Sequence, residues 1–390
     1  MNFAINLRSI LLLLAMVQGL VIAGLLLHRG FKRRQPRDFV LAGLLLALVM
    51  SLVSYFIGFM GVYDYAAQQG WDLTYFPFGN GFLFGPLIWL YVVSVTDHQF
   101  RWKPAWWAHF FLPALYYAVS FYLWLLPVAQ KDIVGRVWMG YVEEFIMTTT
   151  LGAYLFLALR RYFIYRKLLD AEYSNTSKLL LDWLRNFLYV FAAYYVISLI
   201  FTLLNFWINF WYTGWYWLEL TRAILLYYIS VTGWAFAQKV LVPFEAIERR
   251  EAAVGYASSE KAVASKPVFP PEELTQRRDK LSAFMTEKQP WLNPDLTLSE
   301  LASLTGQNAA QLSYLINAGF DKNFNDFVNA YRVEAVKRKM QDPSAAHLSL
   351  LGVAFECGFN SKATFNRAFK KATGMAPSEF SGTRKEPPSA

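Results

Sequence analysis

The 390-residue sequence is poor in cysteine, histidine and charged side chains. Its lone cysteine, Cys357, excludes an intramolecular disulfide and a metal site with several thiolate ligands. The four histidines form no pair at the helical spacing typical of metal ligands. The chain also lacks a nucleophile elbow, a phosphate-binding loop and an H-E-x-x-H motif. These absences predict that the protein is not an enzyme and has no catalytic residue, metal or cofactor.

The shortage of charge is confined to the first part of the chain. Only 17% of residues are charged and 56% are hydrophobic, whereas a soluble domain carries roughly 25% charged residues. Up to about Val242 the chain is a series of apolar runs, and a spanning helix needs about 20 such residues. We predict a seven-helix transmembrane bundle in this part. Its segments are residues 9–27, 38–60, 82–95, 110–126, 144–159, 186–206 and 217–237.

Positive side chains predict the orientation of this bundle. They follow the first, third, fifth and seventh segments, whereas the alternate loops contain few or none. Because loops rich in Lys and Arg stay in the cytoplasm, the N-terminus is expected outside and the C-terminus inside. The predicted location is the bacterial cytoplasmic membrane, with the lipid bilayer as a partner. The two richest loops contain Arg29, Lys32, Arg33, Arg34 and Arg37, and Arg160, Arg161, Arg166 and Lys167.

Two ionisable residues lie inside the seventh segment. Glu219 and Arg222 are three residues apart, so they share one helix face and can pair. Such groups are costly in a membrane and often functional. The pair is either a structural ion pair or a signal switch that a ligand, lipid or protein stimulus rearranges. Glu143 and Glu144 are a second candidate for that role.

Aromatic residues gather at the predicted outer face. They either anchor helix ends in the interface or line a ligand pocket. The candidates are Trp71, Tyr75, Phe76, Trp207, Trp211 and Trp215.

Three parts follow from the change in composition after Val242. Residues 1–242 are the transmembrane, sensor-type domain. Residues 243–271 comprise a helical extension at 244–254 and a linker rich in Ala, Ser, Lys and Pro, which has too little apolar surface for a core. Residues 272–382 regain apolar residues at helical spacing. The whole chain is therefore expected to be all-α.

Two stretches in the last part resemble each other, residues 298–316 and 350–369. In each an Ala precedes a Gly by four residues, Ala302 before Gly306 and Ala354 before Gly358. A small residue lets two helices approach, and glycine supplies the positive φ of a tight turn. This spacing predicts two helix-turn-helix units. Asn308, and either Asn360 or Ser361, are expected to cap the second helices.

A long amphipathic helix is predicted between the two units, at residues 324–340. It can hold two recognition helices apart, and successive major-groove faces are about 34 Å apart. The spacing therefore predicts that double-stranded DNA is contacted in two adjacent grooves. Residues 322–371 contain nine Lys or Arg and four Asp or Glu, so binding is expected to depend on salt.

These residues resemble the DNA-binding domain of the AraC/XylS family of transcription regulators. The resemblance covers about residues 281–380 and is carried by LTLSELA, by NFNDFVNAYRVEAVKRKM and above all by VAFECGFNSKATFNRAFKKATGMAPSEF. It implies two helix-turn-helix units in successive major grooves. The apolar part does not resemble the sugar-binding β-barrel sensor common in that family, but looks like a membrane-anchored arrangement.

The resemblance also implies which residues face DNA. On the second recognition helix they are Lys362, Ala363, Thr364, Asn366 and Arg367. Arginine can contact guanine and asparagine can contact adenine, while lysine can hold phosphate. Lys370 and Lys371 are either backbone contacts or solvated charges. On the first recognition helix the exposed positions are Ala310, Gln311, Ser313 and Tyr314. Family members often carry a basic residue at the position of Tyr314, so this unit is expected to contribute less affinity or to read DNA shape.

The sequence therefore predicts a membrane-anchored, sequence-specific transcription regulator that transmits a signal to cytoplasmic DNA binding. Confinement to the membrane plane favours a homodimer, although no clear coiled-coil seam is present. The alternative is a membrane receptor or transporter whose helix-turn-helix tail mediates protein contacts.

Overall fold

The computed structural model describes residues 6–382 apart from 72, 74, 75, 77, 80, 98, 99, 128–141, 175–180, 209, 211, 238–268 and 346. The chain divides into two compact units. The first comprises Met1–Phe163 and Trp183–Leu241, and the second comprises Ile164–Asp182 and Val242–Ala390. Within the described residues every regular element is a helix, apart from one isolated bridge between Tyr173 and Thr297. The all-α prediction is confirmed.

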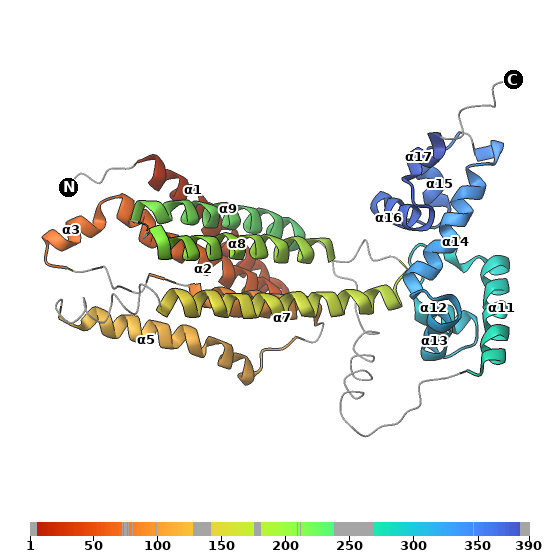
Figure 1. Ribbon diagram of the computed structural model, residues 1–390, viewed down its shortest axis with the longest axis horizontal. Helices are drawn as coiled ribbons and strands as arrows, with labels where there is room; N and C mark the ends of the chain where they lie inside the picture. Colours follow the sequence, from red (N-terminus) through yellow and green to blue (C-terminus); the bar gives the residue numbers. More distant parts are fainter. Residues whose placement is uncertain are drawn as a thin grey trace. The chain divides into compact units, whose positions relative to one another are not determined.

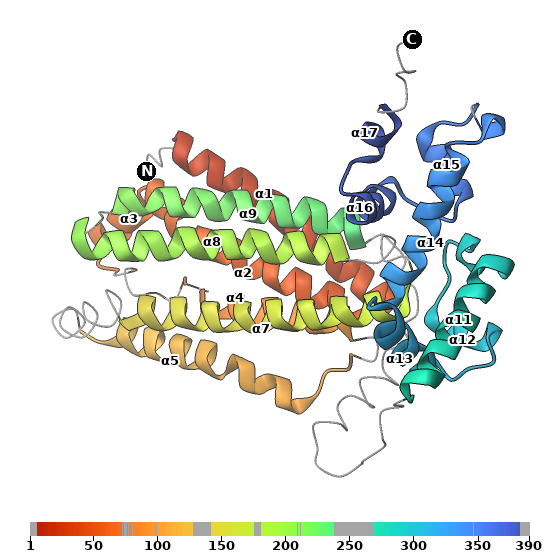
Figure 2. The same cartoon turned by 45° about the vertical axis from the view of Figure 1, so that its right-hand side comes forward.

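The first unit is a bundle of long helices that run side by side (Figures 1 and 2). Helix α1 packs against α2 and α9, and α2 also packs against α4. Gly19 lies at this contact, where an added Cβ would be 2.9 Å from side-chain atoms of Leu226 and Val49. A larger residue there would push the helices apart. The described helices of the unit are α1 (Leu7–Arg33), α2 (Pro36–Phe59), α3 (Val62–Gln68), α4 (Gly81–Thr96), η1 (Pro104–Phe110), α5 (Phe111–Leu125), α7 (Glu143–Glu172, to residue 163), α8 (Leu181–Ile208, from residue 183) and α9 (Tyr212–Ala237).

Each of the seven predicted spans overlaps one of these helices. By length and composition, four described helical stretches are able to cross a membrane. Helix α4 is apolar but shorter, and α7 and α9 are not among the four. The helical nature of the seven segments is confirmed, whereas the count of seven spans remains a prediction. The four stretches are Leu7–Arg33, Pro36–Phe59, Pro104–Leu125 and Asp182–Asn205.

Large apolar side chains point outward from the first unit. Leu14 on α1 is 63% exposed, Phe111 on α5 70%, and Leu203 on α8 59%. On α1 alone, Leu7, Val17 and Val21 are also more than half exposed, and extended exposed apolar surface is rare on soluble monomers. The outward faces of these helices are therefore suited to an apolar surrounding.

The second unit is built around helix α14 (Phe324–Lys339). Helices α11, α12 and α13 gather at one end of α14, and α15, α16 and α17 at the other (Figure 1). A core of buried apolar side chains, including Leu312, Phe327 and Phe365, joins the two ends. The remaining elements are α11 (Pro271–Lys288), η4 (Pro290–Leu292), α12 (Leu298–Leu304), α13 (Ala309–Phe320), η5 (Pro343–Ala345), α15 (Leu350–Glu356), α16 (Lys362–Thr373) and α17 (Pro377–Gly382).

The two compact units differ from the predicted domains at residues 164–182. These residues follow the fifth predicted span and lie within the predicted transmembrane domain, residues 1–242, but in the structure they group with the C-terminal unit. The predicted extension at 244–254 lies outside the described residues, as does residue range 243–268 of the linker.

Candidate nucleic-acid interface and membrane switch

Two helix-turn-helix units are present where the repeated pattern predicts them. Gly306 joins α12 to α13 with φ of 65°, and Gly358 lies between α15 and α16 with φ of 84°. Both values lie in the region that favours glycine. Ala302 and Ala354 are 3% and 0% exposed. The predicted roles of these small residues are confirmed.

Side-chain caps start each of the four helices. The oxygens of Thr297 and Ser349 accept from the backbone N–H of Glu300 and Gly352 at the starts of α12 and α15, each at 3.1 Å. Asn308 caps α13 as predicted. Of the two candidates for α16, Ser361 is the cap. A polar cap satisfies a backbone donor that the helix leaves unpaired and stabilises the start by about 1 kcal/mol.

Helix α14 contributes a buried cation that ties the two ends of the unit together. Arg332 is 0% exposed. Its Nε donates to the carbonyl of Trp291 at 2.8 Å and its Nη2 to that of Asn293 at 2.7 Å. The guanidinium also lies 5.9 Å from the ring centre of Phe359. An added Cβ at Gly358 would be 2.3 Å from the same Trp291 oxygen, so the turn of the second unit lies directly on this junction.

The predicted DNA-reading residues of α16 form an outward polar face, with one exception. Lys362, Ala363, Asn366, Arg367 and Lys370 are exposed. They lie on the face opposite the buried Phe365 and Phe369 of the same helix. This arrangement leaves their polar groups able to reach base edges and phosphates.

Thr364 differs from the prediction that it faces DNA. It is 2% exposed, and its hydroxyl lies 3.0 Å from that of Ser361. The side chain therefore stabilises the start of α16 from inside. Lys371 is exposed, but its Nζ donates to Asp326 on α14 at 2.6 Å. This ion pair differs from both predicted alternatives, a contact to the DNA backbone and a solvated charge.

The first recognition helix, α13, presents a less open face. Gln311, Ser313 and Tyr314 are all half-buried. The ring of Tyr314 packs edge-on against Phe269, with ring centres 5.6 Å apart. Phe269 in turn lies 4.3 Å below the guanidinium of Arg277. Tyr314 is thus part of an apolar contact with the residues before α11, which the sequence did not reveal because it gives no tertiary partner.

The lone cysteine is structural in its setting. Cys357 is 3% exposed beside the second turn. Burial raises the pKa of its thiol, and a thiol held protonated is a poor nucleophile. Among the described residues no group of three or more His, Cys, Asp or Glu side chains is placed to hold a metal ion.

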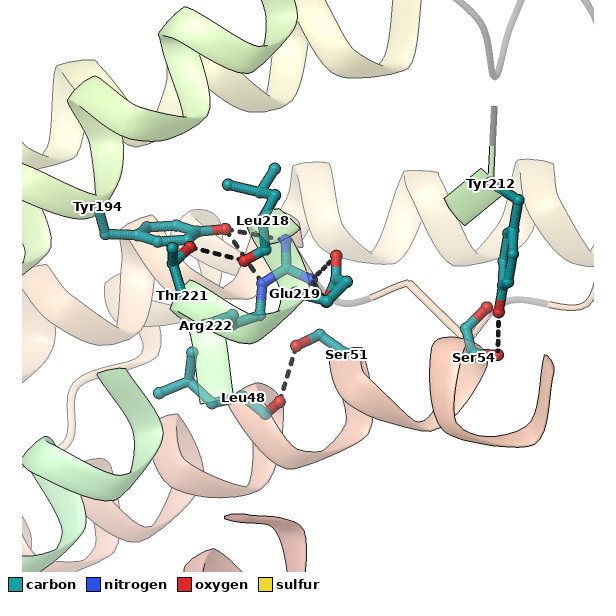
Figure 3. A network of polar contacts seen from close by, with 9 residues as sticks. All are labelled: Leu48, Ser51, Ser54, Tyr194, Tyr212, Leu218, Glu219, Thr221 and Arg222. Carbon is teal, nitrogen blue, oxygen red and sulfur yellow. Dashed lines mark hydrogen bonds and ion pairs between the residues drawn. The ribbon is translucent and has the colours of Figure 1, made fainter. Parts of the chain in front are cut away.

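Glu219 and Arg222 pair inside the first unit, and a third residue joins them (Figure 3). The Nη1 of Arg222 donates to both carboxylate oxygens of Glu219, at 2.8 and 2.6 Å. Its Nε and Nη2 donate to the hydroxyl of Tyr194 on α8, at 3.0 and 2.8 Å. The side chains of Glu219 and Arg222 are 5% and 11% exposed. The predicted pairing is present, whereas its role as a switch remains a prediction.

The second acidic candidate also bonds to α8. The hydroxyl of Thr202 donates to Glu144 at the start of α7, at 2.8 Å. Helix α8 therefore bonds to both candidate switches, to Glu144 through Thr202 and to Arg222 through Tyr194. The sequence did not single out α8 because neither residue is charged.

The aromatic candidates on the predicted outer face divide between separate contacts. Phe76 packs against Phe78 and Trp124, whereas Trp215 packs against Phe201 and Phe210. Trp71 and Trp207 are 70% and 83% exposed, and Tyr75 and Trp211 lie outside the described residues.

Comparison with known proteins identifies the second unit. Residues 301–383 match the family model described as a helix-turn-helix domain. An uncharacterized HTH-type transcriptional regulator of Staphylococcus aureus strain COL is 32% identical over 90 residues, which are 23% of this chain and 12% of that protein. A relative in strain MRSA252 matches with the same identity and coverage. This chain thus spans only 12% of the length of these curated relatives.

One solved structure is also similar to part of the chain. It is a protein of unknown function from Listeria innocua, 24% identical, covering 27% of this chain and 96% of its own, with a TM-score of 0.24. The family match and the paired turns at Gly306 and Gly358 agree on the C-terminal part. That part of the chain is an AraC-type helix-turn-helix domain.

Proposed function

We propose that this protein is a membrane-anchored transcription regulator that binds DNA through its C-terminal domain and responds to a signal in its helical bundle. The observation that carries the proposal is the exposed face of α16, which presents Asn366, Arg367 and three lysines while Phe365 and Phe369 on its other side are buried in the core. Recognition helices of helix-turn-helix domains use such polar faces to contact base edges in the major groove. The relatives named as transcriptional regulators support the same interpretation.

Anchoring in a membrane is supported by the apolar character of the bundle and by the place of residues 164–174 in the fold. Four helices are long and apolar enough to cross a bilayer, and large apolar side chains point outward from α1, α5 and α8. In addition, residues 164–174 follow the fifth predicted span and belong to the same compact unit as the helix-turn-helix domain. Both must then lie on one side of any bilayer, which agrees with the predicted cytoplasmic location of that loop.

For signalling, we propose that Glu219 and Arg222 form the switch. A buried ion pair is costly to break by removing one partner, so a ligand, lipid or protein that offers either group a new partner would favour a different packing of α8 and α9. A stimulus shifts the equilibrium only by its differential affinity for the two packings. A homodimer on paired DNA sites is part of the same proposal.

The rival function is a receptor or transporter whose tail binds protein. Genome-wide occupancy of the full-length protein in its native membrane separates the two. We expect discrete DNA peaks that vanish in an Asn366→Ala, Arg367→Ala double variant. A matched control, Gln276→Ala with Lys280→Ala on the exposed face of α11, likewise removes one side-chain amide and one positive charge and should keep the peaks.

The opposite result favours the rival. If the wild-type protein is present and folded but gives no peaks under several growth conditions, the tail is a protein-binding module. If the control loses its peaks as well, the loss of DNA binding reflects the lower positive charge of the domain and not the loss of contacts from the face of α16.

A further inference from the structure

The end of α7 packs into the unit that contains the two helix-turn-helix motifs. Glu172 is the last residue of α7, and together with Tyr173 and Ser174 it forms what we call the α7 tail. Tyr173 forms an antiparallel bridge with Thr297, the cap of α12. The N–H of Ser174 donates to the carbonyl of Leu296 at 3.1 Å. The α7 tail therefore lies along the segment that leads into the first helix-turn-helix motif, within the same compact unit.

A row of buried polar side chains on α14 bonds to the α7 tail. Asn325, Asn329 and Arg332 lie on one side of α14, because they are separated by four and three residues, and they are 6%, 5% and 0% exposed. Asn329 donates to Asn325 at 2.9 Å and accepts from Arg332 at 3.3 Å. Asn325 donates to the carbonyl of Tyr173 at 3.0 Å, and Arg332 donates to the carbonyl and the hydroxyl of Ser174 at 3.4 and 3.1 Å. The tail thus supplies acceptors to polar groups that are costly to bury without them.

Through these bonds the α7 tail is connected to both helix-turn-helix motifs. The hydroxyl of Ser299, in the first turn of α12, donates to Glu172 at 2.8 Å, and Glu172 is 4% exposed. Arg332 leads to the second motif, since its guanidinium lies 5.9 Å from the ring centre of Phe359. An added Cβ at Gly358 would be 3.1 Å from Nε of the same guanidinium. The tail therefore bonds directly to the start of the first motif, and through Arg332 it meets the turn of the second.

The DNA-facing side of the second motif remains open with the α7 tail in place. Lys362, Asn366 and Arg367 on α16 are all exposed. The hydrogen bonds of the tail described above run to α12, α14 and the segment before α12. Packing of the tail is therefore compatible with DNA binding. To contact two adjacent grooves, the two recognition helices must be held at a defined spacing.

We propose that the α7 tail is a positioning segment of the DNA-binding domain, which holds the two recognition helices in the arrangement that binds DNA. This inference rests on the proposed function. Recognition helices that are not held in place must be ordered when DNA binds, and that ordering reduces affinity. The proposal also names α7 as the route of regulation, because the helix that begins at Glu143 in the bundle ends in the tail. A signal that withdraws the tail lowers DNA affinity and leaves the α16 face uncovered.

The first test measures the arrangement of the recognition helices. Spin labels are attached at Ala318→Cys on α13 and Ala372→Cys on α16, two exposed positions, in full-length Cys357→Ala protein in lipid nanodiscs. Pulsed electron paramagnetic resonance then gives the distribution of distances between the labels. We expect Glu172→Ala with Ser174→Ala to broaden this distribution, because the tail loses both of its side-chain bonds. An unchanged distribution would overturn the proposal.

A matched control removes the same two side chains elsewhere in the unit. Glu287→Ala with Ser303→Ala changes exposed residues on α11 and α12 and should leave the distribution as it is in the parent protein. In a titration with a labelled duplex of about 40 base pairs and mixed sequence, we expect the tail variant to bind about tenfold more weakly than this control. Both variants lose one negative charge, which by itself strengthens DNA binding. Equal affinities would therefore contradict the positioning role.

The second test restores the tail by a covalent link. Opposed antiparallel residues such as Tyr173 and Thr297 have Cα atoms about 4.5–5.5 Å apart, which a disulfide can span. Tyr173→Cys with Thr297→Cys is introduced into protein that carries Cys357→Ala, Glu172→Ala and Ser174→Ala. We expect oxidation to raise the affinity for the duplex about tenfold over the reduced state of the same molecules. Unchanged or weaker binding after oxidation would overturn the proposal, and weaker binding would mean that the tail opposes DNA.

The outcomes separate the α7 tail from the proposed function. If the wild type binds the duplex but neither the label distances nor the affinity responds to the tail variant, the positioning role fails and DNA binding stands. If the wild type does not bind the duplex, the proposed function fails, and the role of the tail in DNA binding fails with it.

Discussion

The turn at Gly358 offers the sharpest test of how the second unit is held together. An alanine there would adopt φ of 84°, in the left-handed region, at a cost of roughly 1–2 kcal/mol. Its Cβ would also lie 2.3 Å from the Trp291 carbonyl oxygen and 3.1 Å from Nε of Arg332. Both neighbours belong to the central junction, so relief requires backbone movement, which adds roughly 1–3 kcal/mol.

Gly306 provides the matched comparison. It has φ of 65°, but an added Cβ would meet nothing within 4 Å. Gly306→Ala should therefore suffer only the conformational cost, whereas Gly358→Ala should suffer both. The expected difference is therefore the steric cost alone, about 1–3 kcal/mol, and about 1.4 kcal/mol corresponds to a tenfold change in an equilibrium constant.

Hydrogen exchange of the full-length protein measures this difference directly. Amides in the core of α14, around Val333 and Val336, report the opening free energy of the unit. We expect them to exchange at least about fivefold faster in Gly358→Ala than in Gly306→Ala. Equal rates in the two variants would refute the argument that close approach to Trp291, and not φ alone, requires glycine at position 358.

Three further predictions concern charge. Glu219→Gln or Arg222→Met alone should destabilise the bundle by about 3–5 kcal/mol, because each leaves a buried charge unpaired; thermal unfolding in detergent should show the double variant to be less affected than the sum of the two, and additive losses would mean the pair is not coupled. Arg367→Ala should reduce the slope of log affinity against log salt by roughly 0.9, whereas an unchanged slope would place Arg367 away from phosphate. Because burial raises its pKa, the thiol of Cys357 should react with a thiol reagent at pH 8 only after urea unfolding; rapid labelling of the folded protein would contradict its burial.

The sequence predicted what depends on local spacing. Helix positions follow from apolar periodicity, and the two turns follow from Ala and Gly four residues apart, since φ is a local property. The pairing of Glu219 with Arg222 follows from their separation on one helix. The exposed face of α16 follows in the same way from the burial of Phe365 and Phe369.

What the sequence left open depends on packing between distant segments. Tyr194 joins the ion pair from another helix, and no spacing rule connects them. Thr364 was predicted to face DNA, but the cap at Ser361 turns its hydroxyl inward. Tyr314 was predicted to be accessible, yet Phe269 packs against it. In each case a neighbour far away in sequence, or a local cap, decided the side chain's environment.

The membership of residues 164–182 in the second unit has a consequence for how the protein is made. Residues 172–174 are synthesised before α8 and α9, whereas their hydrogen-bond partners on α12 and α14, Ser299, Asn325 and Arg332, emerge more than a hundred residues later. At bacterial elongation rates of about 5–20 residues per second this is a delay of several seconds. The domain is therefore discontinuous along the chain, and its last assembly step closes a long loop after the intervening helices have been made. A fragment that begins at residue 272 contains both helix-turn-helix units but lacks Ser174. Arg332 would then keep the acceptors of Trp291, Asn293 and Asn329 and lose the two that Ser174 supplies.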